Sequence, residues 1–252
     1  MSSLPKLKCY FDVVCPNSWM TLQILSENSS LFETIEYSPV CDFKIGILHN
    51  GQIWNQRRKQ HTSRIWKPKK QQEEEIEPEP EGILRRIDER GKQLLNFKTI
   101  EAPKNWSKTY KNAIKKGSII PQLYLTSIKE RCPDLYEEAI QHLGKRLWDE
   151  EKPVHYGCHM STVSRELGIP FRIAEDIVAR LSTPENRHIL NRNCKEALDL
   201  KLTEAPGVII FASADNIGEK EQKSVKFDNV LDLLSSDYVS KSNNDAQISS
   251  IY

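Results

Sequence analysis

Apolar and polar residues alternate near the start of the chain, and Val, Tyr and Phe are frequent there. This pattern predicts a β-strand over residues 6–14. Pro16 then occupies a first helical position, where its missing N–H costs nothing. A helical face follows as far as about Ser29, and a second strand is expected over residues 34–43. The helical face carries Trp19, Leu22 and Leu25. Together these elements predict a β-α-β unit with parallel strands and a right-handed crossover.

The rest of the chain alternates between long helical stretches and two short strands. Residues 83–200 are expected to be helical, with a stop at Gly168 and a new start at Thr183, which precedes a proline. Short strands are predicted over residues 208–211 and 222–227, followed by a closing helix near residues 230–234. Cys194 lies on an apolar helical face and is assigned to the core.

The order of these elements predicts an α/β protein with a large helical insertion. Residues 1–43 plus 200–236 would form the α/β domain, residues 44–199 the insertion, and residues 237–252 a loose tail. Seven basic residues between Arg57 and Lys70 precede six glutamates in residues 73–81. Such a composition cannot bury apolar surface, so a mobile charged loop is expected at about residues 67–82. A docking arm for protein or nucleic acid is the alternative interpretation.

Charge and cysteine content narrow the functional classes. The formal net charge of +1 argues against a general nucleic-acid or membrane-surface binder. No apolar run is long enough to span a membrane, and the first residues carry neither a secretory nor a typical transit signal. The six cysteines form no CxxC pair, which favours reduced thiols in an intracellular protein.

Cys15 stands where the first strand gives way to the first helix. Ligands of parallel α/β sheets gather at this edge, and a helix N-terminus favours an anion. A thiolate there would be stabilised, so a lowered pKa is predicted for Cys15. Cys15 is then a candidate nucleophile, or a hydrogen-bond donor to another thiolate. A buried, chemically inert residue at a strand end is the alternative.

Much later in the chain, His155, Cys158 and His159 have a spacing that suits a metal ion. A fourth ligand is not adjacent, so a structural turn is preferred and no metal site is assigned.

The segment FDVVCPNSW, residues 11–19, resembles the active-site segment of a thioredoxin-like family. That family includes DsbA proteins, kappa-class glutathione transferases and 2-hydroxychromene-2-carboxylate isomerases. Cys15 occupies the place of the kappa-class catalytic serine, and Ser18 stands where DsbA has its second cysteine. The later segments STPENR and EAP repeat the family's interval between a Thr-Pro helix start and a proline. Matching residues in the first segment are Asp12, Val13, Pro16, Ser18 and Trp19. The resemblance implies a DsbA-like thioredoxin fold with an all-helical insertion.

The resemblance also implies a binding site for glutathione as co-substrate. Pro206 would be cis and face Cys15, and the main chain of Ala205 would bind the cysteinyl part of glutathione. The remaining contacts would come from Asp228, Asn55 and Arg64. The chain departs from the family at Phe227, where the family has a serine, and at Lys201 and Glu204, where it has glycines.

The function that the resemblance implies is a kappa-type glutathione transferase that conjugates glutathione to an unidentified electrophile, a detoxification reaction. Cys15 and Ser18 would be its catalytic residues. A monothiol DsbA-like oxidoreductase and a non-catalytic thioredoxin-like protein remain alternatives, and the isomerase is a weaker one. Family members are typically dimers of mitochondria or peroxisomes, so a homodimer is expected, with the cytoplasm as a further possible compartment.

Overall fold

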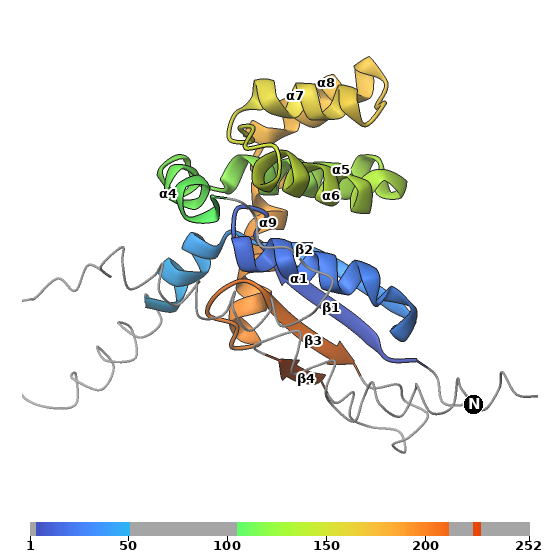
Figure 1. Cartoon of the computed structure of the whole chain (residues 1–252), viewed down its shortest axis with the longest axis vertical. Helices are drawn as coiled ribbons and strands as arrows, with labels where there is room; N and C mark the ends of the chain where they lie inside the picture. Colours follow the sequence, from blue (N-terminus) through green and yellow to red (C-terminus); the bar gives the residue numbers. More distant parts are fainter. Residues whose placement is uncertain (1–3, 51–104, 212–223, 228–252) are drawn as a thin grey trace, which may run out of the picture.

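A four-stranded mixed sheet forms one end of the molecule (Figure 1). In the computed structural model, the described residues are 4–50, 105–211 and the backbone of 224–227. The strands lie in the order β2-β1-β3-β4, and β1 is parallel to β2 but antiparallel to β3. The parallel β-α-β start is therefore confirmed. The strands are β1 (Lys6–Phe11), β2 (Thr34–Pro39), β3 (Gly207–Phe211) and β4 (Ser224–Phe227).

Helix α1 (Pro16–Glu27) connects β1 to β2, and most of the other helices gather at the opposite end of the molecule (Figure 1). Helix α9 packs against α5 and also reaches the sheet, where its Glu196 bonds Lys8 of β1. The remaining elements are η1 (Ser29–Leu31), α4 (Trp106–Lys116), α5 (Ile119–Arg131), η2 (Pro133–Leu135), α6 (Tyr136–Trp148), α7 (Gly157–Glu166), α8 (Phe171–Ala179), η3 (Arg180–Ser182) and α9 (Pro184–Asp199).

Local signals place most of these boundaries correctly. Pro16 opens α1, and the Thr183 hydroxyl caps α9 by accepting the N–H of Asn186. Gly168 takes the left-handed conformation, φ 69°, between α7 and α8. Cys194 is fully buried, as expected. The second strand is shorter than predicted, because it ends at Pro39 and the chain is helical again over residues 42–50.

The helices and the sheet share one apolar core, which runs from β1 through α1, α5, α6 and α9 to β3. Helix α6 joins the two ends of the molecule. The indole N–H of Trp148 donates to the Val13 carbonyl at 2.9 Å, and Gly144 lets α6 approach Trp19 of α1. Helix α6 therefore contacts both the loop after β1 and helix α1, which follows that loop. The charged loop at 67–82, the closing helix and the tail lie outside the described residues.

Candidate active site

Asp12 directly follows strand β1 and organises the loop there. Its carboxylate is fully buried and accepts four hydrogen bonds. One oxygen accepts the backbone N–H of Val14 at 3.0 Å and the side-chain N–H of Gln122 at 2.9 Å. The other accepts the backbone N–H of Asp42 at 3.0 Å and the hydroxyl of Ser118 at 2.6 Å. One side chain thus ties β1, the helix at residue 42 and helix α5 together.

Cys15 lies at the N-cap of α1, directly beyond this loop. Its N–H donates to the Asp12 carbonyl at 2.8 Å, and its own carbonyl accepts the first helical bond, from Trp19 at 3.1 Å. The thiol is only 4% exposed and contacts the carbonyl of Ala205, with Sγ and O 3.6 Å apart. The thiol and the loop before β3 are therefore neighbours, although they are distant in the sequence.

The environment of Cys15 disfavours its thiolate. Burial, reinforced by the negative charges of Asp42 and Asp12, raises the pKa of Cys15 to about 12, although the backbone N–H and hydroxyl of Ser18 act in the opposite direction. The predicted lowering of this pKa is therefore wrong. The helix N-terminus does favour the anion, but the loss of hydration outweighs it. Cys15 is a neutral S–H donor at physiological pH.

The peptide bond between Ala205 and Pro206 is cis, as the resemblance implied. Both polar backbone groups of Ala205 already have partners: its carbonyl accepts the Cys15 thiol, and its N–H donates to Asp42 Oδ1 at 2.8 Å. Sequence reasoning did not single out Asp42. Its one early signal was a charged residue inside the otherwise largely apolar end of the predicted strand over residues 34–43.

Two other side chains complete the surroundings of the thiol. The Ser18 hydroxyl is fully buried and accepts the N–H of Asp12 at 3.2 Å, so it braces the loop. Tyr110 of α4 lies close enough to Asp42 for the charge of that carboxylate to act on it. Burial, reinforced by this charge, raises the pKa of Tyr110, so its hydroxyl stays protonated. No sequence motif pointed to Tyr110.

Three of the expected glutathione contacts, Asn55, Arg64 and Asp228, lie outside the described residues. Lys201 and Glu204 lie in the segment before the cis-proline. Lys201 takes the left-handed conformation, φ 61°, which suits the glycine that the resemblance places there.

The histidines considered as metal ligands have separate backbone partners. His155 donates to the Gly117 carbonyl at 3.0 Å, and the ring of His159 accepts the N–H of Tyr156 at 3.3 Å. Within the described ranges, no group of three His, Cys, Asp or Glu side chains is placed to hold a metal ion. In the same part of the chain, none of the helices has the length and apolarity needed to span a membrane.

The parallel β-α-β start, the antiparallel β3 and a cis-proline beside a cysteine at a helix N-terminus define a thioredoxin-like fold. Its long run of helices between β2 and β3 is the helical insertion of the DsbA-like type.

Comparison with solved structures agrees with this fold. A candidate protein disulfide isomerase from Nitrosomonas europaea superposes with a TM-score of 0.58 at 12% identity, covering 96% of this chain and 99% of that one. A 2-hydroxychromene-2-carboxylate isomerase gives 0.57 at 13% identity, with 98% and 99% covered. The cytosolic disulfide reductase DsbM from Pseudomonas aeruginosa gives 0.52 at 12% identity, with 96% and 99% covered.

No protein-family model matches the sequence, and no curated protein matches it. At these identities, the structural likeness establishes the fold and leaves the chemistry to the residues of the site.

Proposed function

We propose that the protein is a kappa-type glutathione transferase in which the Cys15 thiol donates a hydrogen bond to the glutathione thiolate. The observation that carries this proposal is the buried, protonated Cys15 at the N-terminus of α1, beside the carbonyl that precedes the cis-proline. A neutral S–H can perform the donor role of the kappa-class serine. Tyr110 would supply a second protonated donor.

The reaction uses the sulfur of glutathione as the nucleophile. The glutathione thiolate attacks an electrophilic carbon, a C–S bond forms, and the bond to the leaving group breaks as that group departs with its electron pair. Cys15 is not consumed. Donors aimed at the thiolate lower the pKa of glutathione and hold its sulfur in place for attack.

Two of the similar structures are consistent with this proposal. DsbM from Pseudomonas aeruginosa has been solved with glutathione and superposes with a TM-score of 0.53. The 2-hydroxychromene-2-carboxylate isomerase belongs to the family group that the segment around Cys15 resembles. Glutathione would meet Cys15 and the main chain of Ala205, and a homodimer remains a prediction of the same resemblance.

The monothiol exchange reaction is less well supported, because it requires Cys15 to attack as a thiolate. Burial and the charges of Asp42 and Asp12 oppose that state.

A non-catalytic role has an observation in its favour. The N–H of Ala205, which would bind the cysteinyl part of glutathione, is already bonded to Asp42. Glutathione must displace that carboxylate in order to bind there.

Calorimetric titration with reduced glutathione and turnover of chlorodinitrobenzene test the proposal on the full-length protein. Wild type should bind glutathione and release chloride. Cys15→Ser, which keeps a donor, should stay within a few-fold of wild type, whereas Cys15→Ala should lose roughly 10²-fold in turnover. Cys158→Ser, at an exposed cysteine, is the matched control.

Two results would overturn the proposal. The absence of both heat and turnover would favour the non-catalytic role. Rapid formation of a mixed disulfide with oxidised glutathione, lost in Cys15→Ser, would favour monothiol exchange.

A further inference from the structure

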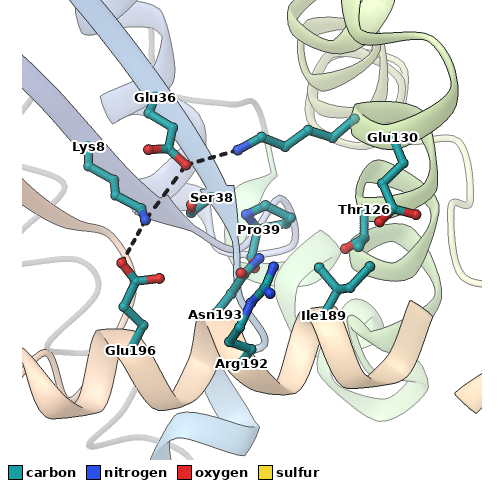
Figure 2. A pocket seen from close by; sticks show the side chains of 11 residues that line it. Lys8, Glu36, Ser38, Pro39, Thr126, Glu130, Ile189, Arg192, Asn193 and Glu196 are labelled. Carbon is teal, nitrogen blue, oxygen red and sulfur yellow. Dashed lines mark hydrogen bonds and ion pairs between the residues drawn. The ribbon is translucent and has the colours of Figure 1, made fainter. Parts of the chain in front are cut away.

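A cavity of about 420 Å³ lies between strand β2 and helices α5 and α9, and it shares no residue with the Cys15 site (Figure 2). Its volume falls within the range of small-molecule sites, roughly 300–1,000 Å³. The lining comes from three groups of residues: Lys8, Glu36, Ser38 and Pro39 on the strands, Thr126, Lys129 and Glu130 on α5, and Ile189, Arg192, Asn193 and Glu196 on α9.

One wall is a chain of alternating charges held in fixed positions (Figure 2). Lys8 lies between two carboxylates, with Nζ 2.7 Å from Glu196 and 3.6 Å from Glu36. Lys129 holds Glu36 from the other side at 3.1 Å and donates to a backbone carbonyl at 3.0 Å. Burial alone would raise the pKa of Glu196, but the hydrogen bond and charge of Lys8 outweigh it, and the pKa is lowered. These charges are prearranged before any ligand arrives.

Arg192 is the cation of the cavity that is best placed to bind an anionic group of a ligand. Figure 2 shows its guanidinium beside Asn193 and Pro39. Within the described part of the chain, no carboxylate lies within 4.0 Å of Arg192, although its charge acts on Glu196. A guanidinium presents paired donors that match the two oxygens of a carboxylate.

Ser38 is a second, independent indication of a ligand. It is only 2% exposed, yet its side chain lines the cavity, and its hydroxyl has no hydrogen-bond partner among the described residues. Its neighbours have theirs: Asn193 donates to the Pro39 carbonyl at 3.1 Å, and Thr126 donates to a backbone carbonyl of α5 at 2.8 Å. The Ser38 hydroxyl therefore faces the cavity and can bond a ligand that enters it.

We infer that this cavity binds a small zwitterion of the α-amino-acid class. Three cations and three carboxylates line it, so a ligand with two separated charges and no net charge suits it better than an anion or a cation. The ligand carboxylate would bind Arg192 and accept the Ser38 hydroxyl, and its ammonium would share the Glu130 carboxylate with Arg180, which is already paired with it. Its apolar part would contact Ile189 and Pro39.

A matched trio of probes tests the charge requirement. L-norvaline carries both charges, pentanoate lacks the ammonium, and n-butylamine lacks the carboxylate. Binding to the full-length protein is followed from backbone amide shifts in NMR titrations at neutral pH. Norvaline should bind, shifting the amides of β2 and α9, and the other two probes should bind about tenfold more weakly or worse.

Two variants test whether the ligand binds the guanidinium of Arg192. Arg192→Gln should weaken norvaline binding about tenfold or more, because it removes the paired charged donors. Arg187→Gln removes another exposed arginine of α9 that does not line the cavity, and it should leave binding unchanged. Cys15→Ser should also leave it unchanged, which separates this inference from the proposed transferase activity.

Three results would overturn the inference. Pentanoate binding as tightly as norvaline would make the site one for anions. Equal losses in Arg187→Gln and Arg192→Gln would show a general charge effect. No shifts with any probe up to about 20 mM would show that the cavity is not a site of this class.

Discussion

At the scale of single residues, Asp42 is the side chain that links the cis-proline loop to Cys15. Its carboxylate accepts the Ala205 N–H, and its charge raises the pKa of Cys15. Asp42→Ala should therefore lower the pKa of Cys15 and, under the proposed function, tighten glutathione binding because Ala205 becomes free to pair with it. Alkylation rate against pH measures the first effect, and calorimetry the second.

Asp42→Asn is the informative control, because it removes the charge but can still accept the Ala205 N–H. It should lower the pKa of Cys15 without a comparable gain in affinity. An unchanged alkylation profile in both variants would contradict the role assigned to the Asp42 charge.

The burial of Asp12 leads to a second prediction, which concerns the pH dependence of protein stability. Burial outweighs its four hydrogen bonds, so the pKa of Asp12 is raised above 3.8 in the folded protein. The folded state then binds more protons than the unfolded chain, and the contribution of Asp12 to stability falls as pH rises from about 4 towards its folded pKa. In Asp12→Asn, an amide N–H₂ replaces one acceptor, and an unpartnered buried donor costs about 1–3 kcal/mol.

The free energy of unfolding from urea titrations at several pH values tests this prediction. Wild type should exceed Asp12→Asn most at low pH, and the gap should narrow as pH rises. The difference between the two curves cancels the titration of other carboxyl groups. A gap that widens with pH would mean that the hydrogen bonds dominate and that the pKa of Asp12 is lowered.

At the scale of elements, the contact between α6 and α1 depends on Gly144. A Cβ at this position would lie 2.2 Å from two ring atoms of the buried Trp19. Gly144→Ala should therefore force the helices apart and destabilise the protein by about 1–3 kcal/mol. Urea unfolding followed by circular dichroism measures the change.

Gly46→Ala provides the matched control, because it makes the same substitution in the helix at residues 42–50 with nothing within 4 Å of the new Cβ. It should stabilise the protein by roughly 0.5–1 kcal/mol. Equal effects of the two substitutions would show that the approach of α6 to Trp19 is not limiting.

At the scale of the whole molecule, the helical end and the sheet are expected to unfold together. They share one core, the Asp12 carboxylate binds α5, and Trp148 bonds the Val13 carbonyl. Such contacts couple the two parts, so tryptophan fluorescence and far-ultraviolet circular dichroism should report coincident urea transitions. Two separated transitions would show that the insertion folds independently of the sheet.

Much of the fold can be predicted from the sequence, because the ends of many elements depend on local rules. Pro16 opens a helix through its fixed backbone angle, Thr183 caps one with its hydroxyl, and Gly168 supplies a left-handed turn. The end of β2 was misplaced, because residues 40–43 are apolar enough for a strand and only the packing of the helix at residue 42 decides otherwise.

The sequence alone placed Cys15 at a helix N-terminus and, through a resemblance, beside a cis-proline. The state of that cysteine was decided by tertiary structure. Its pKa depends on the water excluded around it and on charges brought close in space, and Asp42 and the Ala205 loop become neighbours only when the chain folds. A periodicity rule describes contacts within one element, whereas desolvation sums over every element that covers the group.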